Sequence, residues 1–342
     1  MSSINPSLIG SRRELLRAGG AIAAGALLGN VFSPRSFAES APAAGMAEAP
    51  QSTAPANARS SSALAQARAE MAKTPLQTLK LRENIYMLYG PGGNMVLLTG
   101  PDGKVLVDTG VAPVAAKLKQ TLAGLSNAPL KLVIDSHWHF DHTDNNAALR
   151  AAGAMIVAHE NTRKRMSTPH DLAPLGLHFP PSPEEALPQQ TFRDDLQLHF
   201  NGEEIALTHV PPAHTDTDIF IHYRKGNVLH VADIWFNGFY PFIDGGTGGR
   251  ITGMISAADK AISIADKDTK IVPGHGPLGD KAALIKYRDT LSTCRDRIQR
   301  QKSTGKSLKE VTAAKPTADL DGAWGGGMIN PDTFVALVYN TL

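Results

Sequence analysis

Short apolar runs separated by turn residues characterise the chain from Leu76 onward. The first runs predict β-strands, because each is short and mostly apolar and because turns containing Gly and Pro separate them. They are Ile85–Tyr89, Met95–Thr99 and Lys104–Val107, with turns at Pro91-Gly92-Gly93 and Pro101-Asp102-Gly103. Ala112–Leu125 then predicts a helix, since Pro113 suits a first helical turn.

The same alternation of strands and helices continues toward the C-terminus. The further strands expected are Leu132–Asp135, Ala154–Ala158, Leu196–Phe200, Glu203–Val210, Asp218–Tyr223, Asn227–Ala232 and Lys270–Val272. The further helices expected are Asp144–Ala152, Glu160–Met166, Ile251–Ala265 and Lys281–Gln301. Such alternation needs sheets covered by helices, which makes the fold class α/β, and two sheets sandwiched between helices fit the count.

Two stretches lack a clear period and are expected to be loops. Residues 167–190 contain six prolines, and Ile234–Gly249 is rich in glycine and aromatic residues. Either loop could act as a lid over a site.

Residues 1–38 have the pattern of a signal peptide. The charged segment from Ser11 to Arg17 precedes Ala18–Phe32, which has no charged residue, and Ser36-Phe37-Ala38 offers small residues to a signal peptidase. The paired arginines ahead of two leucines resemble a twin-arginine export signal. The apolar stretch is too short for a membrane span. We therefore expect cleavage after Ala38, the twin-arginine translocase as a transient partner, and a periplasmic or secreted protein without a stable membrane anchor. A buried N-terminal helix is the alternative interpretation.

Residues 39–75 predict a flexible linker. Thirteen of these 37 residues are alanine and none is aromatic, with a marginal helix expected over Ser62–Lys73. Residues 76–342 are expected to form the folded domain, ending in C-terminal helices.

The composition is that of a globular protein, with 342 residues of which 42% are hydrophobic and 19% charged. Loss of residues 1–38 removes four basic residues and one acidic residue, so the formal net charge falls from +2 to −1. This gives no electrostatic argument for nucleic acid as a partner. The single cysteine, Cys294, excludes an intrachain disulfide and a thiolate zinc cluster, and its place on an apolar helical stripe predicts an inert core residue.

The strongest chemical signal is the segment Asp135-Ser136-His137-Trp138-His139-Phe140-Asp141-His142. It follows an apolar strand and precedes a helix. On extended chain His137 and His139 face the same side and can hold one metal ion, whereas Asp141 and His142 face elsewhere and suit a second. Imidazole and carboxylate are the ligands that zinc takes where cysteine is absent. The alternative is a polar loop with scattered histidines.

Three further candidates lie at strand ends, where sites are usually built on α/β sheets. They are His214, in a loop between two strands, Asp233, at the end of the strand Asn227–Ala232, and His275, in Pro273-Gly274-His275-Gly276-Pro277.

The motif His-x-His-x-Asp-His is followed in the chain by His214, Asp233 and His275. In this order of residues the chain resembles the metallo-β-lactamase-fold superfamily, over about residues 76–280. The resemblance implies an αββα sandwich with the site at one edge. It also implies a first zinc ion on His137, His139 and His214, a second on Asp141, His142 and His275, and Asp233 bridging both. The metal could also be iron or manganese.

Two features bear on which branch of the superfamily the chain resembles and on its substrate. Aspartate at position 233 is similar to the glyoxalase II, lactonase and nuclease branches, because the true zinc β-lactamases have Cys or Ser there. Thr143-Asp144-Asn145-Asn146 stand where many members have glycines, which leaves the substrate open.

The implied function is an exported dinuclear zinc hydrolase, in which a hydroxide between the two ions attacks the carbonyl of a small ester, lactone or amide. Asp141 and Asp233 are the expected catalytic carboxylates. Asp108 resembles a residue that orients a ligand histidine, although it could equally be a simple turn residue. The aromatic residues after Asp233 predict either a pocket for an apolar substrate tail or a minor core; they are Trp235, Phe236, Phe239, Tyr240 and Phe242.

The sequence leaves three alternative functions open. They are a β-lactamase acting through the same site, a mononuclear iron dioxygenase of the same fold, and a non-catalytic metal-binding protein. The dioxygenase needs only two His and one Asp, and non-catalytic relatives usually lose ligands, so a full set of seven favours the hydrolase.

Overall fold

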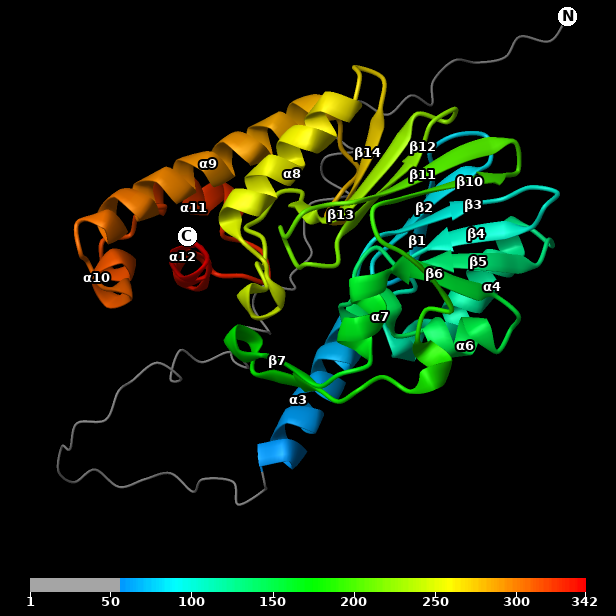
Figure 1. The fold of residues 1–342 in the computed structure, drawn as a ribbon, viewed down its shortest axis with the longest axis horizontal. Helices are drawn as coiled ribbons and strands as arrows, with labels where there is room; N and C mark the ends of the chain where they lie inside the picture. The colour runs from blue at the N-terminus through cyan, green and yellow to red at the C-terminus, as the bar shows by residue number, and fades with distance from the viewer. Residues whose placement is uncertain (1–55) are drawn as a thin grey trace, which may run out of the picture.

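The computed structural model describes residues 56–342, so the expected signal peptide and residues 39–55 of the expected linker lie outside the described residues. Two β-sheets pack face to face and helices cover their outer faces, which confirms the αββα sandwich (Figure 1). Within the described residues no helix has both the length and the apolarity that a membrane crossing needs.

The first sheet has seven strands in the order β1-β2-β3-β4-β5-β6-β9. Its strands β1 to β4 are antiparallel, and β4, β5, β6 and β9 are parallel. Their bounds are β1 Gln77–Lys80, β2 Ile85–Tyr89, β3 Met95–Leu98, β4 Lys104–Val107, β5 Leu130–Ile134, β6 Met155–His159 and β9 Gln190–Phe192.

The second sheet has five strands in the order β10-β11-β12-β13-β14, antiparallel except for the parallel pair β13 and β14. Their bounds are β10 Asp195–Phe200, β11 Glu203–His209, β12 Ile219–Tyr223, β13 Val228–Phe236 and β14 Lys270–His275. One apolar cluster fills the space between the two sheets, and it contains buried residues from both, such as Val107 and Ile221.

Helices on the two outer faces complete the layers. On the first sheet α4 (Ala115–Leu125) and α6 (Asn146–Arg150) cover Leu106 and Val133, and α7 (Glu160–Met166) lies nearby. On the second sheet α8 (Ile251–Ile264) and the long α9 (Lys281–Ser303) pack side by side. The chain ends in α10 (Leu308–Ala313), α11 (Ala318–Trp324) and α12 (Pro331–Asn340), of which α10 and α12 contact α9.

Several predicted boundaries shift for local reasons. Pro113 lies in a short 3-10 turn, Ala112–Val114, before α4. The expected helix Asp144–Ala152 is shortened to α6, and a separate short helix, α5 (Phe140–Thr143), precedes it. The expected strand Asn227–Ala232 continues through Phe236, because all nine residues of β13 are buried and so lack the alternating pattern that marks a half-exposed strand.

The prediction of a loop over 167–190 is wrong in part. This segment contains a hairpin of β7 (His170–Leu172) and β8 (Leu177–Phe179), followed by the 3-10 turn Glu184–Ala186 and by β9. Strands of three residues are too short to show a period among six prolines, which explains the error.

The expected linker also contains more structure than its composition predicts. Helix α3 spans Ala56–Met71, earlier and longer than the marginal helix expected over Ser62–Lys73. It runs beside the β7–β8 hairpin (Figure 1) and packs against β8. Leu64, which is 4% exposed, joins the apolar core. Tertiary contacts therefore stabilise a helix whose own sequence is only weakly amphipathic.

Replacing Leu64 with alanine should test this docking. We expect the free energy of unfolding to fall by about 2–3 kcal/mol, the lower part of the range for buried Leu→Ala changes, since the helix lies at the edge of the core. The control is Leu79→Ala on β1, where the residue is 40% exposed and the change should cost less than about 0.5 kcal/mol. Equal effects of the two substitutions in urea unfolding would argue against a packed α3.

Candidate metal centre

Four donor residues follow strand β5 of the first sheet. His137 and His139 lie in the loop after Ile134, and Asp141 and His142 lie on the short helix α5, which His139 precedes as its N-cap. Extended backbone at His139 gives way to helix at Phe140, which turns the last two donors away from the first two. The predicted division of the motif into two pairs is therefore present.

The other three donors come from the second sheet. His214 lies in the loop between β11 and β12, Asp233 within β13, and His275 at the end of β14. The carboxylate of Asp218 fixes the His214 loop, since it accepts hydrogen bonds from the backbone N–H groups of His214 and Thr215, both at 2.9 Å. Burial raises the pKa of Asp218 to about 7, although these donors favour its ionised form.

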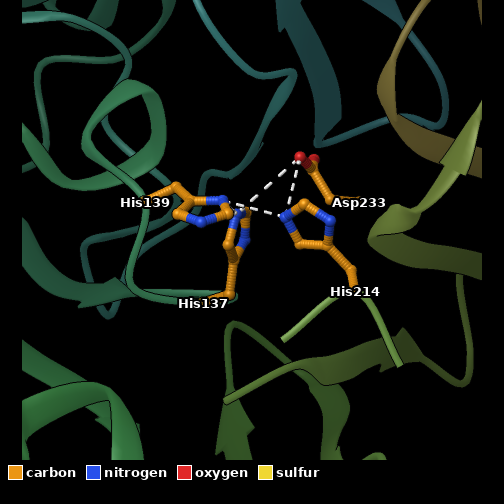
Figure 2. Close-up of side chains that lie close together, drawn as sticks. All are labelled: His137, His139, His214 and Asp233. Atoms are coloured by element: carbon orange, nitrogen blue, oxygen red, sulfur yellow. Dashed lines mark hydrogen bonds and ion pairs between the residues drawn. The ribbon is translucent and has the colours of Figure 1, made fainter. Parts of the chain in front are cut away.

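The structure brings all seven predicted donors together in two groups. His137, His139, His214 and Asp233 form the first group, and Asp141, His142 and His275 form the second. Figure 2 shows the four side chains of the first group pointing toward one another. Within it Nδ1 of His139 lies 3.1 Å from Nε2 of His137 and 2.8 Å from Nε2 of His214.

Asp233 lies between the two groups. Its Oδ2 is 3.4 Å from Nε2 of His214 and 3.4 Å from Nε2 of His275, and its Oδ1 is 3.2 Å from Nε2 of His142. Oδ2 of Asp141 is 3.3 Å from Nε2 of His275. One carboxylate thus faces donors of both groups, as a bridging ligand would.

Two buried atoms indicate that these residues fit metal ions. Nε2 of His142 and Oδ1 of Asp233 are buried and, although they lie 3.2 Å apart, neither atom makes a hydrogen bond within the described chain. Buried polar atoms are otherwise almost always satisfied. Imidazole nitrogens and carboxylate oxygens are ligands of zinc and related divalent metals, so the donor set suits such an ion.

Charge is distributed unevenly over the donor residues. Burial lowers the pKa of His137 well below its usual value and that of His214 to about 4. For His142 and His275 burial acts in the same direction, but the carboxylates of Asp233 and Asp141 outweigh it. They raise the pKa of His142 well above its usual value and that of His275 to about 9. Protons on these two rings thus balance the two carboxylates.

Asp108 orients His142, as the resemblance implies. Its Oδ2 lies 2.7 Å from Nδ1 of His142 and accepts a hydrogen bond from the Ser136 hydroxyl at 2.7 Å. This contact leaves Nε2 of His142 directed at the centre. Asp108 itself has a φ of 61°, in the left-handed region that non-glycine residues rarely adopt.

The sequence prediction missed Asp244, which has the same relation to His139. Oδ2 of Asp244 lies 3.2 Å from Nε2 of His139 and also accepts a hydrogen bond from the hydroxyl of Thr247. That hydroxyl in turn accepts a hydrogen bond from Nε1 of Trp138 at 3.3 Å. The sequence holds only a weak signal, because Asp before Gly-Gly-Thr reads as the cap of a turn, which Asp244 also is.

Two glycines allow the backbone to approach the centre closely. A Cβ atom at Gly93 would lie 2.0 Å from Cε1 of His142, and one at Gly274 would lie 2.0 Å from Oδ1 of Asp233. Any side chain at either position would displace a donor.

A cavity that opens to solvent lies beside the centre, and the space within it, open solvent included, is about 550 Å³. His139, Asp141, Asp233 and His275 form its polar end. Its apolar lining consists of Ala67, Met71, Phe140, Leu172, Leu175, Leu177, Phe236, Phe242 and Met328.

Of the five aromatic residues considered for a pocket, only Phe236 and Phe242 line this cavity. Trp235 is fully buried near Tyr287, and Tyr240 stacks on Phe334. Both therefore belong to the core below the C-terminal helices, as the alternative interpretation held, and Phe239 packs against that core.

Comparison with known proteins agrees with this geometry. The model of the metallo-beta-lactamase superfamily matches residues 88–275, from β2 to the end of β14 and more than half of the chain. A protein of Methanocaldococcus jannaschii described as a probable metallo-hydrolase is 26% identical over 202 residues, which cover 57% of this chain and 93% of the relative.

Two solved structures have a similar fold. A metallo-beta-lactamase from Pontibacter korlensis has a TM-score of 0.52 at 18% identity and covers 64% of this chain and 99% of its own. The stereoselective inverting sec-alkylsulfatase from Pseudomonas sp. has a TM-score of 0.58 at 16% identity, and the match covers 81% of this chain but 51% of the sulfatase. At these identities the likeness shows the fold alone. On the family match and the curated relative, this chain belongs to the metallo-beta-lactamase superfamily and is a metal-dependent hydrolase.

Proposed function

We propose that this protein is an exported dinuclear zinc hydrolase that cleaves a small ester, lactone or amide. The observation that carries the proposal is the pair of donor groups with the Asp233 carboxylate between them. A single ion would need only part of this set, and a non-catalytic scaffold would not need a cavity that reaches Asp141 and Asp233.

In this proposal His137, His139 and His214 would hold the first ion, Asp141, His142 and His275 would hold the second, and Asp233 would serve both. When bound, the two ions would supply an activated water and polarise the substrate carbonyl. The donor chemistry supports zinc, because neither group contains cysteine and both combine imidazole with carboxylate.

The protein's own residues orient the metal ligands and limit the access of water to the substrate. Asp108 and Asp244 hold the rings of His142 and His139, so both keep one nitrogen directed at the centre. Asp141 faces the cavity and is placed to accept a hydrogen bond from the attacking water. An apolar substrate tail bound against the lining beyond it would keep bulk water from the reacting carbonyl.

The cavity supports an uncharged or monoanionic substrate with an apolar tail. Among the described residues that line it, none is lysine or arginine, so no side chain there would pair with a second anionic group. Aspartate at position 233, where the true zinc β-lactamases have Cys or Ser, makes a penicillin a weaker candidate.

Asp233→Ala should separate the dinuclear proposal from its alternatives. We expect the wild-type protein, purified gently, to hold close to two zinc ions per chain by elemental analysis. The variant should lose the second ion first, with metal affinity or turnover reduced at least about 10–100-fold, because loss of a bridging ligand should cost no less than loss of a supporting partner.

The matched control is Asp332→Ala, which removes an exposed carboxylate paired with Lys315 on the surface. It should leave the metal content unchanged. A reproducible value near one ion per wild-type chain, with iron dominant, would instead favour the dioxygenase.

A panel of substrates should identify the bond that is cleaved. With zinc-loaded enzyme we expect higher kcat/KM on lactones and esters with apolar tails than on penicillins, thioesters, phosphodiesters or sulfate esters. Cleavage of penicillins or carbapenems at about 10⁴–10⁸ M⁻¹s⁻¹, with lactones and esters left intact, would favour the β-lactamase alternative.

Export rests on residues 1–38 and has its own test. Replacing Arg12 and Arg13 together with lysine should trap the precursor in the cytoplasm, because the signal is read through the arginine pair. Immunoblots of cell fractions provide the measurement. Normal amounts of mature protein in the periplasm would contradict the twin-arginine signal.

A further inference from the structure

One wall of the cavity beside the metal centre comes from outside the region that matches the family. That region is 88–275, whereas Ala67 and Met71 belong to α3, and Met328 lies between α11 and α12. Further lining residues come from the β7–β8 hairpin, against which α3 packs, and they are Leu172, Leu175 and Leu177. Three separate parts of the chain thus line an apolar space that reaches the donors.

A two-point ion pair fixes α3 to the metal motif. The guanidinium of Arg68 donates to both oxygens of Asp144, at 2.7 and 2.6 Å, and the Asp144 side chain is only 8% exposed. The backbone N–H of Ala112 donates to the same carboxylate at 3.1 Å. Paired charge-assisted hydrogen bonds of this kind set orientation as well as distance. Asp144 directly follows α5, the helix that carries Asp141. The ion pair therefore positions α3, and with it the cavity wall that α3 forms, relative to Asp141.

The lining of the space indicates what it accommodates. Met71 and Met328 are unbranched and adaptable side chains, whereas the three leucines are buried. An unbranched saturated chain can follow such a space, and its carbonyl end would lie beside Asp141 and Asp233. A chain with charged groups along its length would find no partner among these residues.

We propose that α3 and the β7–β8 hairpin form a binding cleft for an unbranched aliphatic chain of the substrate. In this cleft Met71, Leu175 and Met328 determine the chain length that the enzyme prefers. The inference rests on the proposed function, because hydrolysis of a carbonyl compound at the metal centre defines which end of the substrate reacts.

A homologous series of lactones provides the main test, with side chains from methyl to nonyl and the zinc-loaded mature enzyme. We expect kcat/KM to rise about two- to fourfold for each added methylene until the cleft is filled, as expected for burial of a CH₂ group. Met71→Trp should reduce the ratio of kcat/KM for the longest to the shortest lactone at least about tenfold.

The matched control is Leu79→Trp, which adds the same side chain at an exposed position on β1 and should leave that ratio unchanged. Arg68→Met should flatten the dependence on chain length, because α3 would lose its fixed position, while zinc content stays at the wild-type value. Circular dichroism checks that each variant is folded. If Met71→Trp does not fold, Met328→Trp tests the same cleft.

Binding of octanol, measured by calorimetry, tests the cleft separately from the proposed hydrolase function, because octanol has the aliphatic chain but no hydrolysable bond. Octanol binding that Met71→Trp weakens, without hydrolysis of any lactone or ester, would support the cleft and contradict the proposed function. Lactone hydrolysis that is independent of chain length in both the wild type and Met71→Trp would overturn the cleft and leave the proposed function intact.

Discussion

The buried carboxylate of Asp233 is the group on which the rest of the centre depends. It lies within reach of histidines from both groups, and a buried carboxylate is costly unless cations or hydrogen bonds compensate it. Protons on His142 and His275 supply that compensation in the metal-free chain. Bound ions would replace them, so metal uptake should release protons.

Maintaining this arrangement requires unfavourable backbone geometry. Ala232, just before Asp233, has a φ of 47°, and the parallel pairing of β13 with β14 changes register on either side of it. Asp108 is left-handed as well. Such residues cost on the order of 1–3 kcal/mol each and persist where the surrounding structure determines them. Ala232 lies within β13 and Asp108 directly follows β4, and both strands are fully buried, which holds the two residues in place.

The sequence could predict the donors because their signal is local. The spacing of His137, His139, Asp141 and His142 can be read from the sequence even where the predicted element boundaries are wrong. The remaining three donors follow apolar runs that are easily recognised. The supporting contacts are different in kind. Asp244 meets His139 across 105 residues, and Arg68 meets Asp144 across 76, so no window of sequence contains both partners. The β7–β8 hairpin escaped prediction because strands of three residues carry no measurable period.

The position of α3 has a consequence for how such an enzyme can change over evolutionary time. The donors and their supporting carboxylates lie within residues 88–275, whereas Ala67, Met71 and Met328 lie before and after them. Selection can therefore act on the two regions separately. Exchange or mutation of the flanking segments would remodel the cavity without altering a donor, and the aspartate that receives Arg68 would remain as the attachment point for a new segment. One unchanged reaction centre could in this way serve a succession of substrates.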